Sequence, residues 1–378
     1  MTPAFHDVVA GRRVALVHDW LTGMRGGEKV LESLCRLFPA AELFTLVHRR
    51  GSVSELIEDR RIRTSVIQHL PYASRWYRQY LPAFPVAVEL LDLDAVDLVI
   101  STSHCAAKAV VPTGRARHVC YCHTPMRYVW DQFDPYFGPA RIGRVASASA
   151  RVVAAWLARW DRATAPRVDR FIANSRHVAG RIARYYNRPA TVVHAPVDTQ
   201  FFTPGADPPE PFFLVVSALV PYKRLDVAIR AAARIGARLK IIGVGPDERR
   251  LRAEAGPGVE FLGAVTDIVL RDAYRRATAL VMPGEEDFGI APVESLACGR
   301  PVVALARGGA CETIENEVTG VLVSDPGPDA FATAMQAVAG ARFDPAVLRA
   351  RADRFSVDRF ESAMRAVLVE TLTTEHAW

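Results

Sequence analysis

The sequence predicts an α/β protein made of two doubly wound, parallel-sheet domains. Three observations lead to this prediction. The chain has 378 residues, more than one hydrophobic core usually accommodates. Short apolar strands alternate with amphipathic helices in both halves of the chain, which is the pattern of βαβ units. The alternation breaks only once, at 192–211, so we expect one domain at 1–200 and a second at 201–355.

In the first half, the earliest predicted strand is the apolar run RVALVHDW. The loop TGMRGG follows, and the spacing of apolar residues then predicts a helix. The expected strands are 13–20, 41–47, 97–102, 118–123 and 171–175, and the expected helix is 28–38. Ligands of such sheets bind beyond the carboxyl ends of the strands.

The segment VVHAPVDTQFFTPGADPPEP at 192–211 is rich in proline and has no regular period, which predicts a linker. The alternation then resumes, with strands expected at 212–219, 238–243, 259–263, 279–284 and 301–305 and helices at 224–235, 247–255 and 267–277. A final helix is predicted after Ser356, a suitable N-cap, because apolar residues recur at 357, 360, 364, 367 and 368.

Charge is divided unevenly between the two halves. Residues 1–200 hold 27 basic and 17 acidic side chains, whereas 201–378 hold 20 and 24. The basic half predicts an anionic partner, which could be a phosphate, a lipid surface or nucleic acid; a general arginine bias explains the excess equally well. No RNA-binding signature or zinc-finger spacing is present, so nucleic acid is the weakest of these partners.

The expected location is the cytoplasm. The chain has no uninterrupted run of about 18 apolar residues, and its first residues, MTPAFHDVVAGRR, do not resemble a signal peptide. The six cysteines are scattered and suggest no disulfide framework.

The stretch GEEDFGIAPVE at 284–294 is the strongest candidate site. The strand before it ends at Gly284, and Pro292 suits the first turn of a helix that runs through Cys298, with Gly299 as its C-cap. Glu286 then lies on the loop and Glu294 in the first turn. Separate contacts to a long ligand suit this spacing better than a hydrolytic pair or a metal site. Glu294 could equally serve only to complement the helix dipole.

Several motifs, in order along nearly the whole chain, resemble the retaining glycosyltransferases of family 4, which have the GT-B fold. They are GMRGGEKVL (23–31), YCHTPMRYVWD (121–131), RFIANSRHVAGRI (170–182), APVDTQFF (195–202), LVPYKRLD (219–226) and E-x7-E at 286–294, followed by SLACGRPVVALARGGACETI. Within the family, the sequence is most similar to bacterial polysaccharide-assembly mannosyltransferases that use GDP-mannose. The resemblance also implies that the terminal helix, 356–378, crosses back to the N-terminal domain.

The resemblance assigns the nucleotide sugar to the C-terminal domain. Glu294 would hold the ribose hydroxyls, and Glu286 the hydroxyls of the transferred sugar, because carboxylates accept paired hydrogen bonds from hydroxyls. Backbone N–H groups of Phe288, Gly289 and Ile290 would assist Glu286.

Lys223 would contact the donor diphosphate and stabilise the leaving group. It is one of only four lysines, although a lysine at the start of a helix is commonly just solvated. The family often has an arginine five positions earlier, where this chain has Ala218, and Arg224 is a candidate substitute.

In the N-terminal domain, which would receive the acceptor, the resemblance points to a loop and a strand end. The backbone at Gly26 and Gly27 would lie beside the donor phosphates and the acceptor, although both glycines also suit an ordinary tight turn. His123 would contact the sugar or the reaction centre, and Trp130 and Asp131 would shape the acceptor side.

Other patterns suggest different functions less well. The run HVCYCH at 118–123 has two histidines and two cysteines, but C-x-C is not the usual spacing of a structural zinc site. The DLD sequence at 92–94 resembles a D-x-D metal-binding motif, but it lies in a helix-like run. The sequence GVGPDE at 243–248 lacks the third glycine of a dinucleotide-binding fingerprint. The arginine- and tryptophan-containing stretch 141–167 predicts a core-packed amphipathic helix, with membrane-surface contact as the alternative.

The resemblance to family 4 implies a retaining, metal-independent and cofactor-free hexosyltransferase that uses a nucleotide sugar as co-substrate. The leading hypothesis is transfer of mannose from GDP-mannose to a polyprenyl-diphosphate-linked oligosaccharide or other glycan, at the inner face of the cell membrane. The alternatives are a UDP-sugar donor, a small-molecule acceptor, or a sugar-nucleotide epimerase on the same fold.

Overall fold

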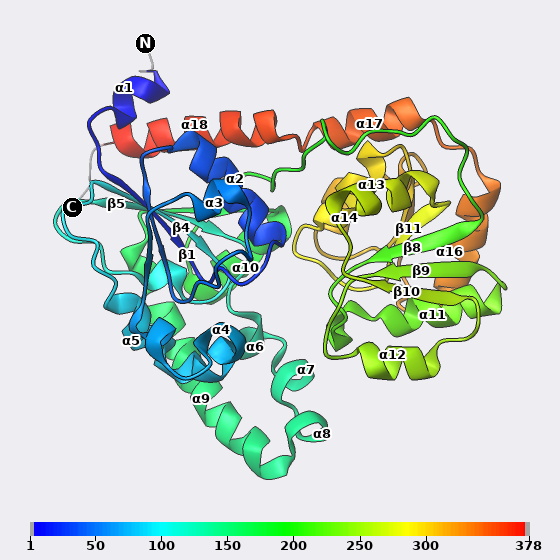
Figure 1. Cartoon of the computed structure of the whole chain (residues 1–378), viewed down its shortest axis with the longest axis horizontal. Coiled ribbons are helices and arrows are strands. Elements are labelled where there is room, and N and C mark those ends of the chain that lie inside the picture. Colours follow the sequence, from blue (N-terminus) through cyan, green and yellow to red (C-terminus); the bar gives the residue numbers. More distant parts are fainter. Residues whose placement is uncertain (1–3, 375–378) are drawn as a thin grey trace. The chain divides into compact units, whose positions relative to one another are not determined.

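The computed structural model describes residues 4–374, which form two compact units. The first unit comprises 4–195 together with 360–374, and the second comprises Pro196–Arg359. The sequence placed the corresponding boundaries at 200 and 355, a few residues away. Each unit has its own sheet (Figure 1). Each also has its own hydrophobic core.

The sheet of the first unit is wholly parallel, with strand order β3-β2-β1-β4-β5-β6-β7. Its strands are β1 Val14–His18, β2 Glu42–Thr45, β3 Ile62–Thr64, β4 Leu98–Ser103, β5 Arg117–Cys122, β6 Arg170–Ala173 and β7 Ala190–Val192. β4 is buried along its whole length because strands flank it on both sides and helices cover the sheet.

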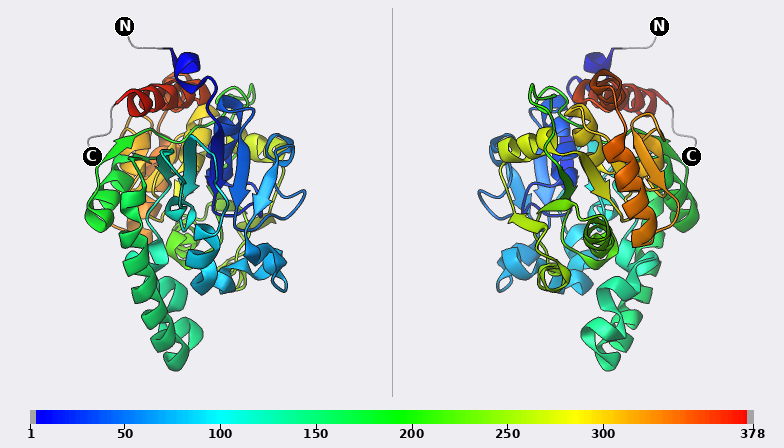
Figure 2. Two further views of the ribbon diagram at one scale, coloured as in Figure 1. Left: turned by 90° about the vertical axis from the view of Figure 1, so that its left-hand side faces the viewer. Right: turned by 90° about the vertical axis from the view of Figure 1, so that its right-hand side faces the viewer.

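Short helices make most of the connections in this unit. They are α1 Phe5–Val9, α2 Gly26–Leu37, α3 Glu55–Glu58, η1 Val66–His69, α4 Ala73–Trp76, η2 Tyr77–Ala83, α5 Phe84–Glu89, η3 Ala107–Ala109, α6 Arg127–Trp130, α7 Phe133–Phe137, α8 Pro139–Ile142, α9 Arg144–Ala163, η4 Ala165–Arg167 and α10 Arg176–Tyr186. The longest, α9, extends well beyond the sheet, with α8 at its far end (Figure 2).

A buried ion pair fixes the C-terminal end of α9 to the core of the unit. Lys108 Nζ lies 3.0 Å from Asp161 Oδ1 and donates to Thr164 Oγ1 at 2.9 Å. Asp161 Oδ2 accepts from Trp130 Nε1 at 2.7 Å and from the Tyr186 hydroxyl at 2.9 Å. Buried charges are tolerated when they are paired and hydrogen-bonded in this way.

The terminal helix α18, Val357–Thr373, belongs mostly to the first unit. Ser356 accepts from the Arg359 amide at 3.3 Å, so the predicted N-cap is confirmed. The Phe360 ring lies edge-on to Tyr121 of β5, with centroids 5.7 Å apart, and Arg170 pairs with Glu370 at 3.1 Å. The expected return of the last helix to the N-terminal part of the chain is therefore confirmed.

The second unit has a six-stranded parallel sheet in the order β10-β9-β8-β11-β12-β13. Its strands are β8 Phe212–Val216, β9 Arg238–Ile242, β10 Val259–Gly263, β11 Ala279–Met282, β12 Val302–Leu305 and β13 Gly320–Val323. Its helices are η5 Pro221–Lys223, α11 Leu225–Arg234, α12 Glu248–Glu254, α13 Asp267–Arg276, α14 Ile290–Ala297, α15 Ala310–Thr313, α16 Pro328–Gly340 and α17 Pro345–Asp353.

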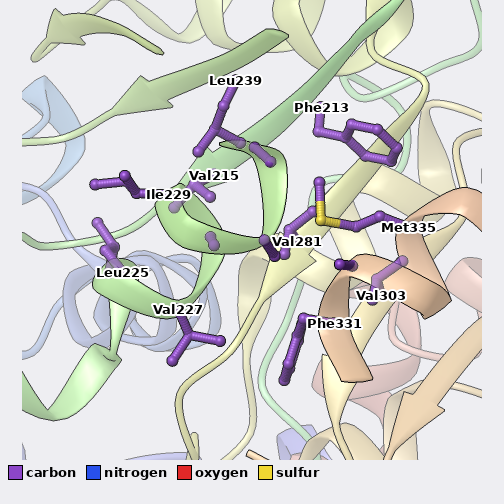
Figure 3. Close-up of a cluster of buried hydrophobic side chains, with 14 of the residues drawn as sticks. Phe213, Val215, Leu225, Val227, Ile229, Leu239, Val281, Val303, Phe331 and Met335 are labelled. Carbon is purple, nitrogen blue, oxygen red and sulfur yellow. The ribbon is translucent and has the colours of Figure 1, made fainter. Parts of the chain in front are cut away.

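The core of the second unit lies between its sheet and the helices α11 and α16. Val215, Leu239 and Val281 from the strands meet Ile229 of α11 and Met335 of α16, all at most 2% exposed (Figure 3). β-branched and leucine side chains on the strands fill the sheet face, while the unbranched methionine adapts to the remaining space.

A few elements differ from the sequence-based expectations. The expected strands and helices are present within a few residues, whereas the short strands β3, β7 and β13 were not predicted. Helix α14 begins at Ile290, so Glu294 lies in its second turn rather than its first. The helix starts there because Gly289, with φ 85°, is its N-cap. Cys298 is the C-cap and Gly299 follows it at φ 73°. The DLD motif lies in a loop, since α5 ends at Glu89.

The glycines of GVGPDE serve a backbone contact. Gly243 has φ 134°, and a Cβ there would lie 1.9 Å from the Ser217 carbonyl oxygen. A Cβ at Gly245 would lie 2.3 Å from the Leu219 carbonyl oxygen. The loop after β9 therefore packs directly on the loop after β8, and this explains the G-x-G spacing without a dinucleotide.

We expect Gly243→Ala to destabilise the second unit by about 3 kcal/mol, because the new methyl group meets a carbonyl oxygen and the backbone conformation is strained for alanine. Differential scanning calorimetry can measure the loss. Gly256→Ala is the matched control, since a Cβ there has open space. Equal stability of the two variants would contradict the close contact.

Candidate functional site

Each sheet has one position where the strand order reverses direction. In the second unit, β8, β9 and β10 run one way from β8, while β11, β12 and β13 run the other way from β11. The corresponding pair in the first unit is β1 and β4. Ligands of doubly wound sheets bind in the crevice beyond the carboxyl ends of such strands. Most of the predicted site residues lie beyond these strand ends.

In the second unit, Lys223 and Glu286 meet beyond the reversal point. Lys223 ends η5, which follows β8, and Glu286 lies on the loop after β11. Their side chains form an ion pair through Lys223 Nζ and Glu286 Oε1, and they are 13% and 18% exposed. Two opposite charges, partly withdrawn from water at a strand-end crevice, are suited to binding a polar, anionic ligand.

Glycines allow three loops to come together around this pair. A Cβ at Gly284 would lie 2.7 Å from Lys223 Cα, and one at Gly308 would lie 2.2 Å from the Glu286 carbonyl oxygen. The Gly309 amide donates to that same carbonyl at 2.8 Å. The GG sequence after β12 therefore holds the Glu286 loop in place by main-chain contacts.

Glu294 is positioned by a tyrosine that the sequence analysis missed. The Tyr274 hydroxyl, fully buried, donates to Glu294 Oε2 at 2.8 Å. Burial and the neighbouring Glu294 charge hold the pKa of Tyr274 well above its usual value, so the hydroxyl remains a donor. Tyr274 lies in the helix predicted at 267–277, where a single tyrosine carries no functional signal, and only its partner reveals its role.

The remaining predicted residues of this unit lie on the same loops. Phe288 is buried against Phe355, while Gly289 and Ile290 form the start of α14. Arg224 has φ 53° and its Nε lies 3.3 Å from Asp226. Ala218 is exposed, and so is Arg307, one residue before Gly308. Arg307 was not singled out from the sequence, although it lies within the quoted stretch SLACGRPVVALARGGACETI.

In the first unit, a buried carboxylate organises the reversal point. Asp19 follows β1 and accepts four backbone hydrogen bonds, from His104 and Cys105 at 2.7 and 2.9 Å and from Ala106 and Ala107 at 2.6 and 2.7 Å. His104 Nδ1 also lies 3.0 Å from Asp19 Oδ2. Burial alone would raise the pKa of Asp19, but the charge and hydrogen bonds of His104 outweigh it, so the pKa lies well below its usual range.

His123 and the glycine loop meet beside this clamp. His123 follows β5, and its amide donates to the Ser103 carbonyl at 2.8 Å. Gly27 lies in the first turn of α2, where a Cβ would be 3.5 Å from His123 Nε2 and 3.4 Å from His18 Cε1. Gly26 is exposed at the start of the same helix. His104, with its ring centroid 6.2 Å from that of His123, was missed by sequence reasoning, although it closely follows the DLVIST strand.

Trp130 and Asp131 lie in a different set of contacts. Trp130 stacks on Tyr185 with centroids 4.8 Å apart, and its ring nitrogen is bonded to Asp161. Asp131 pairs with Arg181 at 2.9 Å. The structure therefore gives both residues partners within the first unit, and their role toward an acceptor remains a proposal.

The HVCYCH run has the environment of a core strand. Burial raises the pKa of Cys120 to about 12 and lowers the pKa of His118 to about 4. His118 Nε2 lies 2.8 Å from the Ser101 hydroxyl. Within residues 4–374, no group of three or more His, Cys, Asp or Glu side chains is placed to hold a metal ion. No helix of the described chain is long and apolar enough to cross a bilayer.

Two known protein families match successive parts of the chain. Residues 24–201 match the family described as Glycosyltransferase Family 4, and residues 210–340 match Glycosyl transferases group 1. The first match lies almost entirely in the first unit and the second lies wholly in the second unit. The chain belongs to the family 4 glycosyltransferases.

Family members with assigned names are similar over part of the chain. The D-inositol 3-phosphate glycosyltransferase of Mycolicibacterium gilvum is 32% identical over 231 residues, which are 54% of this chain and 51% of that protein. The enzyme of that name from Mycobacteroides abscessus is 35% identical over 182 residues, 41% of each chain. This glycosyltransferase thus matches about half the length of its curated relatives or less.

Solved structures show the GT-B fold over almost the whole chain. Sucrose-phosphate synthase from Thermosynechococcus elongatus superposes with a TM-score of 0.72 at 18% identity, covering 95% of this chain and 99% of that chain. Anabaena HepE in complex with UDP-glucose gives 0.68 at 18% identity, covering 94% and 99%. The predicted fold class is therefore confirmed.

We expect Asp19→Asn to destabilise the first unit by about 3 kcal/mol at pH 7, because the amide cannot accept all the bonds of the carboxylate. The folded-state pKa of Asp19 is depressed, so its stabilisation is complete above its unfolded pKa of about 4 and declines as the pH falls below it. The difference between wild type and variant should therefore shrink in acid.

Urea unfolding followed by tryptophan fluorescence can measure this difference at pH 7 and at lower pH. Trp20, Trp76, Trp130, Trp156 and Trp160 all lie in the first unit, and the described part of the second unit has none. Asp94→Asn, at an exposed carboxylate, is the control. A stability difference that does not change with pH would contradict the role assigned to the Asp19 charge.

Proposed function

We propose that this protein is a retaining glycosyltransferase that moves a hexose from a nucleotide sugar to an acceptor hydroxyl. The observation that carries the proposal is the Lys223–Glu286 ion pair beyond the reversal point of the second sheet. A diphosphate needs a cation and a sugar needs hydrogen-bond acceptors, and the pair supplies both within a few ångströms. Membership of the glycosyltransferase family supports the same reading.

In the proposed complex, the second unit binds the donor. The diphosphate takes Lys223 from its partner, which frees Glu286 to accept hydrogen bonds from the sugar hydroxyls. Glu294, oriented by Tyr274, holds the ribose. Arg224 and Arg307 are the exposed cations on neighbouring loops, and either could supply the charge that Ala218 lacks. The first unit receives the acceptor near Gly27 and His123.

The chemical step needs no general base from the protein. The bond between the anomeric carbon and the phosphate oxygen breaks, and the acceptor oxygen bonds to the same face of that carbon. The departing phosphate oxygen takes the acceptor proton. Lys223 and the amides at the start of α14 stabilise the charge that develops on the phosphate.

The donor has two candidates with different support. Sequence resemblance favours GDP-mannose and a lipid-linked or glycan acceptor in the cytoplasm. The structural likeness to HepE, which was solved with UDP-glucose, favours a UDP-sugar donor. The names of the relatives favour a phosphorylated small acceptor. A thermal-shift panel of GDP- and UDP-sugars distinguishes them, because a ligand raises stability according to its affinity.

We expect Glu294→Ala to abolish the thermal shift given by the true donor, because the ribose loses both of its hydrogen-bond acceptors. Tyr274→Phe should reduce the shift, since Glu294 then lacks the donor that orients it. Glu260→Ala, at a partly exposed carboxylate of the same unit, is the control. A shift that is unchanged in Glu294→Ala would refute the role given to this residue.

Lys223→Met should lower the rate of nucleoside diphosphate release from that donor by about 10²- to 10³-fold, because the leaving group loses its cation. Arg238→Met, at an exposed position of the second unit, should leave the rate unchanged.

Incubation of wild-type protein with the donor alone tests the reaction type. A changed sugar on an intact diphosphate would show an epimerase and contradict the transferase proposal.

A further inference from the structure

Two stretches of the first unit contain arginines and no acidic residue. Residues 60–88 hold five arginines and residues 135–160 hold four, with no aspartate or glutamate in either. The first stretch contains α4, η2 and most of α5, and the second contains α8 and most of α9. Six of these arginines lie in helices, at 75, 78, 141, 144, 151 and 159, whereas the other three lie at or just before β3, where Arg61 and Arg63 pair with Glu42.

Helix α9 has an apolar face that no part of the described chain covers. Val145, Val152 and Trp156 recur at helical spacing and are 83%, 72% and 45% exposed. The opposite face, which includes Ala154 and Leu157, is buried. Helices of soluble proteins normally keep apolar side chains on the buried face, so this second apolar face requires a partner.

The arginines border the apolar face of α9. Arg144 and Arg151 project about a quarter turn from the line of Val145, Val152 and Trp156, and both are exposed. Arg159 continues the exposed face toward the C-terminal end. An amphipathic helix with tryptophan on its apolar side and arginines beside it has the composition of helices that lie in a bilayer interface.

A second exposed apolar group comes from the segment 72–90. Tyr72 and Trp76 are 68% and 43% exposed and their rings lie 4.7 Å apart, while Val86 and Leu90, one turn apart, are 61% and 65% exposed. Tyr72 has φ 53°, a conformation that a bulky residue rarely adopts and that costs free energy. The fold thus holds an aromatic pair in solvent at some cost.

The two groups belong to neighbouring elements. Trp160 of α9 donates to Glu89 of α5 at 2.9 Å. Trp160 lies one helical turn from Trp156, and Glu89 directly precedes Leu90. Figure 1 shows α4, α5 and α9 on the same side of the sheet of this unit. The apolar–arginine surface is defined by the apolar side chains Tyr72, Trp76, Val86, Leu90, Val145, Val152 and Trp156 and by the flanking arginines Arg75, Arg78, Arg141, Arg144, Arg151 and Arg159.

We propose that the apolar–arginine surface docks on an anionic lipid bilayer. Tryptophan and tyrosine suit the headgroup region, where one end of the ring is apolar and the other is wet, and the arginines contact lipid phosphates. The charge of the surface selects the partner, because its flanking arginines, all exposed, are complementary to an anionic membrane. This inference is independent of the donor and of the reaction.

Vesicle flotation tests the proposal with the full chain. Wild-type protein should float with vesicles that contain phosphatidylglycerol and not with pure phosphatidylcholine vesicles. Binding should weaken from about 0.1 M to about 1 M salt, over which the Debye length falls from about 10 to about 3 Å. No flotation on the anionic vesicles would overturn the proposal.

Variants identify the surface. Arg144→Glu combined with Arg159→Glu should weaken binding at least about 30-fold, because each basic residue near an anionic bilayer contributes about fivefold. Trp76→Ser and Trp156→Ser should each weaken it about tenfold, as expected for a large apolar side chain that leaves the interface. The mutated side chains are exposed, so folding should be retained, and an unchanged tryptophan-fluorescence unfolding curve for the charge variant verifies this.

Matched controls lie on the second unit. Arg238→Glu with Arg249→Glu reverses two exposed arginines, and Ile268→Ser changes a side chain that is 59% exposed. These variants should bind vesicles as the wild type does, and equal loss in controls and test variants would contradict the assignment.

Analytical ultracentrifugation tests whether the apolar–arginine surface instead binds a second copy of the chain. A dimer that dissociates in Trp156→Ser, without vesicle binding, would make the surface an interface between copies and overturn the proposal.

Discussion

The strand-end region of the second unit depends on main-chain segments that touch without side chains between them. The loop after β9 packs on the loop after β8, the loop after β11 on η5, and the loop after β12 on the loop after β11, and in each case a glycine makes the contact. Because these contacts join successive loops around the reversal point, they fix where Lys223 and Glu286 lie. The ion pair is thus a consequence of backbone packing. The sheet and the glycine contacts set the positions of the two side chains.

The first unit solves the same problem with charge. Asp19 takes the place that glycines have in the second unit, since one buried carboxylate binds four consecutive amides of the segment that follows β4. Lys108 and Asp161 form a second buried centre, which fixes α9 by one end and leaves the other end in solvent. The two units share a topology but differ in how their functional loops are held. One is held by close backbone approach and the other by ionic hydrogen bonds.

The sequence predicted central elements better than peripheral ones, for physical reasons. β1, β4, β8 and β11 are buried and read as apolar runs, whereas β3 and β7 are half-buried edge strands of three residues and leave no such signal. Gly289, Glu286 and Glu294 were recognised because they are close in sequence. Tyr274 and His104 were missed because their significance comes from partners brought together by folding, as when Asp19 binds amides more than 80 residues away.

Helix α18 has a consequence for how the protein is made. It begins in the second unit, and from Phe360 onward its side chains pack on the first. On the ribosome, the N-terminal unit is synthesised first but must wait for nearly the whole chain before its last helix emerges. Until then, the surface around Tyr121 that this helix covers stays exposed to the surroundings of the nascent chain. The second unit is contiguous in sequence and can complete its fold without that delay, so the unit translated last can be the first to be finished.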